Sequence, residues 1–176
     1  MKTRALVCAI SLTLILAAAV PAKAQGPAGN PLNQLAWMVG GKWQADAAKG
    51  PDSKPFHAEW KCRWGANHRT LNFTVWFRTD GRLVPVYTGL YAWNPAKKKL
   101  IFVYTDNEGA LTEGEAVMDG DHLEQDFHII GTDGMSRPYR STIIRRGQDS
   151  YDWNVQSQKD GAWIPMFTLQ YKRSRD

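Results

Sequence analysis

The 176-residue sequence lacks the short motifs that usually identify a catalytic centre. It contains no Gly-x-Ser-x-Gly elbow, no phosphate-binding loop of the Walker type and no His-Glu-x-x-His motif. Nothing in it therefore points to a nucleophile elbow, a nucleotide site or a zinc-protease centre. With 43% hydrophobic and 22% charged residues, the composition is typical of a globular protein and too apolar for a disordered one.

Long apolar runs are also absent, except at the N-terminus. Two basic residues precede an uncharged, mostly apolar run over residues 5–20, and Ala22-Lys23-Ala24 follows it. A basic start, a short apolar run and a small-x-small site are typical of a secretory signal peptide. The run is short for a spanning helix, and no stop-transfer pattern follows. The sequence therefore predicts a signal peptide over 1–24, cleaved near Ala24.

Once this segment is removed, the chain has a small net charge and a single cysteine. Cleavage leaves 19 basic and 17 acidic residues, a net charge of +2, which offers no strong basic patch for a nucleic-acid partner. Only Cys62 then remains, so the fold has no intramolecular disulfide and must depend on packing. We expect a tail over 25–29 and a single domain over 30–176, in a secreted, periplasmic protein with no integral membrane span.

What the sequence does have is a regular alternation of apolar and polar residues between evenly spaced turns. Turn signals such as Asp80-Gly81, Asp119-Gly120 and Asp160-Gly161 recur about every 13 residues. A period of two places one set of side chains inside and the other outside. The predicted strands lie near 42–47, 55–64, 69–78, 83–93, 99–105, 110–118, 122–130, 136–146, 150–157 and 162–172.

These strands predict an all-β fold, a single antiparallel up-and-down β-barrel of nine or ten strands. No stretch after residue 40 has the helical period that a crossover between parallel strands would need. Closing the meander removes two exposed edges, and a barrel of this width leaves an internal cavity. A short helix precedes the first strand, with Asn30 as its cap, Pro31 in its first turn and Gly40-Gly41 at its end.

The segment between this helix and the first strand resembles a known family. Leu-x-Trp-(apolar)-(apolar)-Gly-x-x-Trp over residues 35–43, which contains Gly41-Lys42-Trp43, is similar to the entry of lipocalin-like (calycin-type) barrels. Secreted bacterial domains of unknown function share this pattern. The resemblance implies that Trp43 closes one barrel end beneath a basic side chain of the last strand, either Lys172 or Arg173.

More distantly, the pattern resembles the nitrobindin-like barrels, which bind haem through a histidine on a strand near the C-terminus. The four histidines are His57, His68, His122 and His128, and none lies in the last two predicted strands. We therefore expect no cofactor, haem included.

Three groups of polar residues would suggest catalysis or metal binding if they pointed into the barrel, but the alternation of apolar and polar residues places them on the outside. Glu124, Asp126 and His128 share one strand face and could bind a metal or act in acid–base chemistry if they pointed inward. The opposite face carries the apolar residues, so we expect all three to face solvent, and His57 and Glu59 likewise. Glu113 and Glu115 resemble a glycosidase carboxylate pair only in their spacing, and we expect them on the surface or the rim.

Aromatic residues carry the main functional signal, with 8 Trp, 6 Tyr and 6 Phe. Ligand pockets usually have apolar walls with a few polar groups. Aromatic side chains can supply the walls, and the hydroxyl of Tyr and the indole N–H of Trp can supply the polar groups. Arg140 is the cation we expect to hold an anionic head group. The predicted ligand-binding residues are Trp60, Trp64, Phe73, Tyr87, Tyr91, Tyr104, Phe127, Arg140, Trp153 and Phe167.

The sequence thus favours a secreted, periplasmic lipocalin-like protein that binds a small apolar or amphipathic molecule in the barrel, with no catalytic residue and no metal. Two alternatives stay open. One is a barrel enzyme that uses an internal histidine or carboxylate. The other is a protein-binding module whose barrel is filled by its own side chains, because filled and hollow barrels need the same alternation.

Overall fold

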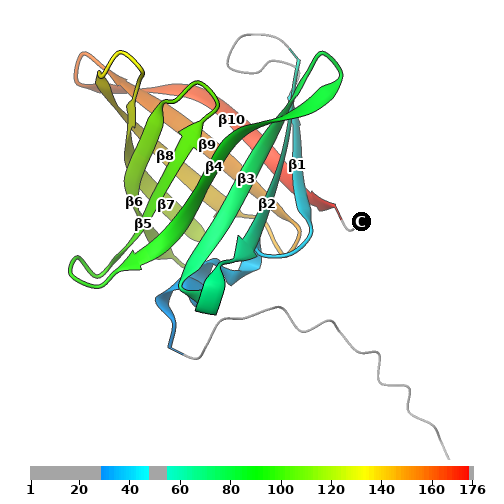
Figure 1. Cartoon of the computed structure of the whole chain (residues 1–176), viewed down its shortest axis with the longest axis vertical. Coiled ribbons are helices and arrows are strands. Elements are labelled where there is room, and N and C mark those ends of the chain that lie inside the picture. Colours follow the sequence, from blue (N-terminus) through cyan, green and yellow to red (C-terminus); the bar gives the residue numbers. More distant parts are fainter. Residues whose placement is uncertain (1–28, 48–54, 175–176) are drawn as a thin grey trace, which may run out of the picture.

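The chain folds into a closed barrel of ten antiparallel strands (Figure 1). The computed structural model describes residues 29–47 and 55–174, so the expected signal peptide and nearly all of the expected tail lie outside the described residues. The strands are β1 (Lys42–Ala47), β2 (Phe56–Trp64), β3 (Thr70–Thr79), β4 (Arg82–Asn94), β5 (Lys99–Asp106), β6 (Leu111–Asp119), β7 (His122–Ile130), β8 (Ser136–Arg145), β9 (Ser150–Lys159) and β10 (Ala162–Ser174). Two 3₁₀ helices accompany them, η1 (Pro31–Met38) and η2 (Ala66–His68).

The predicted fold class is confirmed, and every predicted strand is present to within two residues at each end. Each strand pairs with the next along the chain, and β1 also pairs with β10 through Trp43 and Arg173. This last pairing spans three residue pairs, from Lys42–Ser174 to Gln44–Lys172, and closes the barrel. No helix of the described residues is long and apolar enough to cross a membrane.

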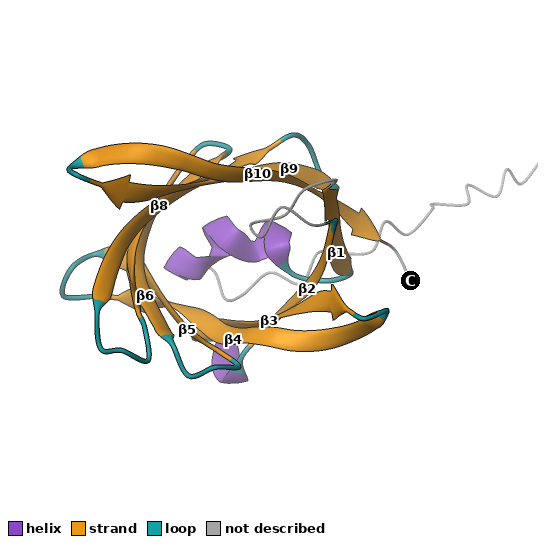
Figure 2. Cartoon of the chain, turned by 90° about the horizontal axis from the view of Figure 1, so that it is seen from above, coloured by secondary structure: helices purple, strands orange, loops and turns teal. Residues whose placement is uncertain are grey.

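The predicted short helix is η1, which lies across one end of the barrel (Figure 2). The Asn30 side chain caps it by accepting a hydrogen bond from the backbone N–H of Leu32 at 3.0 Å, and Pro31 occupies its first turn. Leu32, Leu35 and Met38 are almost fully buried. The helix therefore acts as a floor that closes this end of the barrel.

Trp43 and Arg173 complete the floor, as the lipocalin resemblance implies. Trp43 is fully buried, and its indole N–H donates to the carbonyl of Met38 at 3.0 Å. The Arg173 guanidinium lies over the Trp43 ring at 4.1 Å from its centroid and donates to the carbonyls of Val39 and Gly40. The basic side chain is thus Arg173, whereas Lys172 is exposed. These contacts join the first strand, the last strand and the helix in one cluster.

Glycine is required at position 114 of β6, because two aromatic side chains lie directly against the backbone there. A Cβ placed on Gly114 of β6 would lie 2.4 Å from the Cβ of Phe127 and 2.9 Å from the ring of Phe102. Both distances are far below van der Waals contact, so only glycine leaves room for these rings. The two aromatic side chains can therefore pack over the inner face of the barrel wall.

Candidate functional site

The barrel encloses a cavity of about 280 Å³ above the floor. Tyr151, whose ring centroid lies 4.9 Å from that of Trp43, is at its closed end. Its other end is next to the hairpin between β9 and β10, where Met166 is 46% exposed. The cavity thus extends from the buried floor towards solvent.

The lining is aromatic and uncharged. All six phenylalanines and all six tyrosines of the chain line the cavity. Two tryptophans, Trp60 and Trp153, line it as well. Among the described residues, no Lys, Arg, His, Asp or Glu contributes to the lining. Such a cavity stabilises a bound molecule by burying apolar surface and by ring contacts, and it offers no ion pair.

Eight of the ten predicted ligand-binding residues line this cavity: Trp60, Phe73, Tyr87, Tyr91, Tyr104, Phe127, Trp153 and Phe167. Trp64 does not, because it lies at the floor end of β2 and stacks on His68 with 4.9 Å between ring centroids. Whether any of the eight binds a ligand stays a prediction.

Arg140 lies on the outer surface of β8 and not in the cavity. Its guanidinium pairs with Asp126 at 2.7 Å and lies over the Trp163 ring at 4.3 Å from the centroid. The inward face of the strand carries Tyr139 and Ser141, so the alternation turns Arg140 outward. The expected role of Arg140 as a cation for an anionic head group therefore has no support in this geometry.

The sequence-based list omitted more than half of the lining. Five of the six aromatic residues that it missed share the inward face of their strands with predicted ones, so alternation could have found them. The sixth, Tyr139, lies on β8, where the predicted residue was Arg140 on the opposite face. The remaining lining residues are Phe56, Val75, Phe77, Phe102, Gln125, Ile129, Tyr139, Ser141, Ile143, Tyr151, Val155, Met166, Leu169 and Tyr171.

Three polar side chains form a hydrogen-bonded chain deep in the cavity. The Ser141 hydroxyl donates to Gln125 Oε1 at 2.7 Å, and Gln125 Nε2 donates to the Tyr91 hydroxyl at 3.0 Å. The three residues are 3%, 7% and 7% exposed, respectively. They come from β8, β7 and β4, and β4 is not a neighbour of β7 in the sheet. Gln125 and Ser141 face each other across the β7–β8 pair, whereas Tyr91 reaches them only when the barrel closes, so no local sequence signal places it there.

Burial keeps the cavity tyrosines protonated. Burial raises the pKa of Tyr104 to about 12, and it also raises the pKa values of Tyr91, Tyr151 and Tyr171 above the ordinary range. A phenolate would have to lose its hydration in an uncharged cavity. At neutral pH these hydroxyls are therefore neutral groups that can donate a hydrogen bond.

The histidines lie outside the cavity. His122 and His128 are exposed on β7, His57 lies on the outer surface of β2, and His68 packs on Trp64 near the floor. The cavity lining therefore supplies no histidine to a haem iron, and the residues present do not fit the histidine ligation of the nitrobindin-like barrels.

The acidic candidates also point outward, as predicted. Glu124 and Asp126 are exposed on the outer face of β7. Glu115 forms ion pairs with Lys97 and Lys99 outside the barrel, and these hydrogen bonds lower its pKa to about 2. The described residues contain no cluster of three or more potential metal ligands. The spacing of Glu113 and Glu115 therefore does not produce a carboxylate pair inside the barrel.

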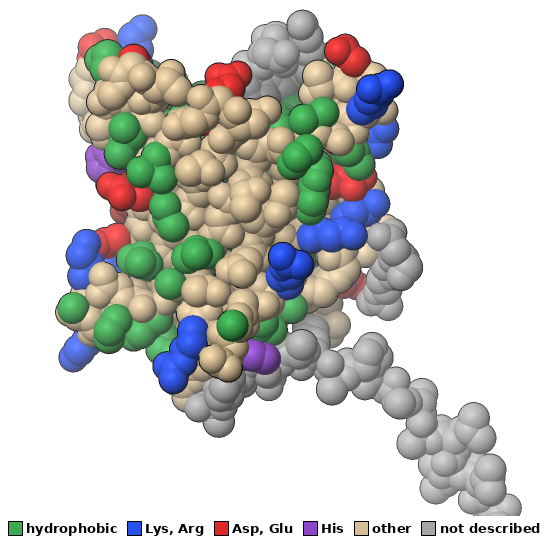
Figure 3. Space-filling model, in the orientation of Figure 1, with side chains coloured by type: hydrophobic (Ala, Val, Ile, Leu, Met, Phe, Trp, Pro, Cys, Tyr) green, Lys and Arg blue, Asp and Glu red, His purple; other side chains and the backbone are tan. Residues whose placement is uncertain are grey.

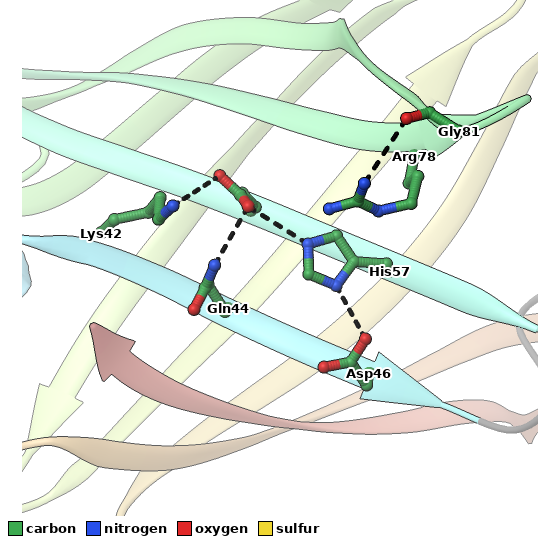
Figure 4. A network of polar contacts seen from close by, with 7 residues as sticks. Lys42, Gln44, Asp46, His57, Arg78 and Gly81 are labelled. Atoms are coloured by element: carbon green, nitrogen blue, oxygen red, sulfur yellow. Dashed lines mark hydrogen bonds and ion pairs between the residues drawn. The ribbon is translucent and has the colours of Figure 1, made fainter. Parts of the chain in front are cut away.

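One polar network joins the outer faces of β1 and β2 (Figure 4). Glu59 accepts a hydrogen bond from Gln44 at 3.0 Å and pairs with Lys42 at 3.3 Å. The His57 ring lies between Glu59, at 3.2 Å, and Asp46, at 2.7 Å. Burial would raise the pKa of Glu59, but the hydrogen bonds from Gln44, His57 and Lys42 outweigh it and lower the pKa. This network ties the two strands together and adds no residue to the cavity lining. His57 and Glu59 lie on the outer face as predicted, but the partners of Glu59 cover it, so it is only 6% exposed and does not face solvent.

Cys62 is buried, and burial raises the pKa of its thiol to about 12. We expect iodoacetamide to alkylate the folded protein roughly a hundredfold more slowly than the urea-unfolded protein, because only the thiolate attacks. Mass spectrometry of timed samples measures both rates. Equal rates in the two states would contradict the buried position of this thiol.

The surface is mixed in character. On the face shown in Figure 3, hydrophobic side chains appear in separate groups with charged side chains between them. Exposed large apolar residues include Leu83, Met135 and Ile164, which lie in or beside hairpins. This face therefore does not present one continuous apolar surface.

The fold and the site together define a ten-stranded antiparallel β-barrel with an aromatic, uncharged internal cavity. No family model matches the chain, and no curated protein matches it either. Among solved structures, the chain is similar to Rv2717c from M. tuberculosis, with a TM-score of 0.55 and 16% sequence identity over 82% of this chain and 97% of that chain. At this identity the likeness shows the fold alone.

Proposed function

We propose that this protein binds a small apolar or amphipathic molecule in the barrel cavity. The observation that carries the proposal is the lining, which contains every phenylalanine and tyrosine of the chain and, among the described residues, no charged side chain. A wall of this kind gains free energy when a ligand with apolar surface displaces water. We further propose that the protein works in the periplasm after removal of residues 1–24, which the basic start and apolar run support.

The cavity volume sets the ligand size. An engineered apolar cavity of about 150 Å³ in another protein holds benzene. A volume of about 280 Å³ suits a molecule of about two fused rings. Both alternatives from the sequence lose support. Glu124, Asp126 and His128 on β7 face solvent, which weakens the alternative of an enzyme with an internal histidine or carboxylate. The aromatic residues leave a cavity, which weakens the alternative of a barrel filled by its own side chains.

Native mass spectrometry of protein purified from a periplasmic expression tests for a resident ligand. The expected result is a mass excess that disappears when the same sample is denatured. A bare chain, even after incubation with periplasmic extract, would count against the proposal.

Filling the cavity should weaken the binding of a neutral fluorescent probe. Val155 lies on the inner face of β9 and is 5% exposed. In the Val155→Trp variant we expect the affinity for 1-aminonaphthalene, a two-ring amine that is neutral at pH 7, to fall at least tenfold, because the larger side chain occupies the ligand's volume. Titration of probe fluorescence, excited beyond the tryptophan band, measures the dissociation constant.

Glu124→Trp is the matched control, since it adds the same side chain to the exposed outer face of β7. It should leave probe affinity unchanged. Equal affinities for the wild-type protein and the Val155→Trp variant would place the probe outside the cavity and contradict the proposal.

A further inference from the structure

The deep polar chain in the cavity leaves two donor hydrogens unused, one on the Tyr91 hydroxyl and one on the Gln125 amide nitrogen. Ser141 donates to Gln125, and Gln125 donates to Tyr91, so the Tyr91 hydroxyl acts as an acceptor within this chain. None of the hydrogen bonds found among the described residues uses the hydrogen of the Tyr91 hydroxyl. A hydroxyl that accepts a hydrogen bond becomes a better donor, because hydrogen bonds in series polarise one another. The chain therefore ends in a donor at the cavity wall.

Another donor lines the same cavity without a partner. The indole nitrogen of Trp153 is buried and has no hydrogen-bond acceptor among the described residues. Buried donors normally have acceptors, because an unpaired one loses its hydration without compensation. Unused donors in an otherwise aromatic wall, among them the Tyr91 hydroxyl and the Trp153 indole, indicate that the molecule in the cavity brings acceptor atoms.

Charge excludes one large class of acceptor-bearing molecules. An anion would need a cation to offset its desolvation, and the nearest candidate from the sequence, Arg140, is on the outer surface in an ion pair with Asp126. No Lys, Arg or His of the described chain lines the cavity. Fatty acids and other carboxylates therefore fit the site poorly, whereas a ketone, quinone, ester or ether oxygen accepts a hydrogen bond without carrying charge.

We infer that the cavity selects a neutral, flat aromatic molecule of about two rings with a carbonyl or ether oxygen, and that the Tyr91 hydroxyl donates a hydrogen bond to that oxygen. This inference rests on the proposed function and specifies its ligand class. The aromatic walls recognise the rings, and Gln125 and Ser141 hold the Tyr91 hydroxyl in position. Tyr91 is thus the binding residue, and Gln125 and Ser141 are positioning residues.

Three naphthalene compounds of similar size test the inference at neutral pH: naphthalene, 2-acetonaphthone and 2-naphthoate. They carry no acceptor, a neutral acceptor and an anionic acceptor, respectively. Equilibrium dialysis against the purified protein, with absorbance to quantify the ligand, gives each dissociation constant. We expect 2-acetonaphthone to bind roughly three- to tenfold more tightly than naphthalene, which is the gain from one hydrogen bond. We expect 2-naphthoate to bind at least tenfold more weakly than the ketone.

Tyr91→Phe removes the donor and keeps the ring. It should abolish the preference for 2-acetonaphthone over naphthalene while leaving naphthalene affinity within about twofold. Thr142→Val is the matched control, since Thr142 follows Ser141 on β8 and alternates to the outer face. It removes a hydroxyl without approaching the cavity and should keep the preference.

The outcomes distinguish failure of the inferred ligand class from failure of the proposed function. Naphthalene binding without a preference for the ketone, or equal binding of 2-naphthoate and the ketone, would overturn the inference and leave the proposed function standing. A preference that survives in Tyr91→Phe would overturn the role of Tyr91. Failure of all three compounds to bind at their solubility limits would overturn the proposed function itself.

Discussion

Replacing Trp43 by alanine is expected to lower the free energy of unfolding by about 3–5 kcal/mol, which is a large part of the 5–15 kcal/mol available to a domain. The side chain is fully buried, donates to the Met38 carbonyl and lies beneath the Arg173 guanidinium. Its loss would leave a cavity where the helix, the first strand and the last strand meet. Urea unfolding followed by far-ultraviolet circular dichroism measures the change.

Two further variants keep this prediction testable if Trp43→Ala does not fold. Trp43→Phe retains an aromatic ring and loses the indole hydrogen bond, so we expect a smaller loss of roughly 1–2 kcal/mol. Trp163→Ala is the control on the outer surface, where Arg140 lies over the ring, and it should cost less than about 1 kcal/mol. Equal losses for Trp43→Ala and Trp163→Ala would show that the floor cluster does not stabilise the barrel as we describe.

Changing Gln125 to glutamate is expected to make stability strongly dependent on pH. The substitution preserves shape but places a carboxyl group at a 7% exposed position in a cavity lined, among the described residues, by no cation. Burial should raise the folded-state pKa of this group above the value of about 4.3 for an exposed glutamate. The unfolded state then binds fewer protons than the folded state, so the variant loses stability as pH rises.

The expected loss relative to wild type is small at pH 4, grows by about 1.4 kcal/mol per pH unit and reaches about 3 kcal/mol near pH 7. It levels off once the pH passes the folded-state pKa. Urea unfolding at a series of pH values measures it. Gln158→Glu provides the control, because Gln158 is exposed at the end of β9 and its variant should follow the wild type. A Gln125→Glu curve parallel to the wild type would contradict a buried position for this side chain in a cavity without a cation.

The two predictions concern the floor of the barrel and the polar chain deep in the cavity, and sequence reasoning dealt with them unequally. Trp43 could be identified from the sequence because Gly41-Lys42-Trp43 after a short helix is a local pattern. Its basic partner could be narrowed only to Lys172 or Arg173, and the structure selects Arg173, whose guanidinium lies over the ring. Gln125 had no local signal, because it was one polar residue among the inward positions of β7.

The cavity residues likewise fall into those that the sequence pattern predicts and those that it does not. Alternation over β2 and β3 predicted that Trp60 and Phe73 face inward, and both line the cavity. Alternation alone could not separate Trp64 from Trp60, since both share the inward face of β2. The difference is their height along the barrel, because the helix closes the end at which Trp64 lies. Arg140 was placed by its chemistry alone, and its position beside the inward-facing Tyr139 could have corrected that expectation.

By itself, the sequence determined the strands, their turns, the antiparallel order and the inner and outer faces of the barrel. These features depend on contacts between residues that are adjacent or a few positions apart, so a period of two and a turn dipeptide encode them directly. Only the tertiary structure decided the depth of each side chain, the size of the cavity and the meeting of Tyr91, Gln125 and Ser141. The depth of each side chain and the size of the cavity depend on closure of the whole barrel. Gln125 and Ser141 already face each other on paired strands, but closure brings Tyr91 to them from β4, which neighbours neither β7 nor β8 in the sheet.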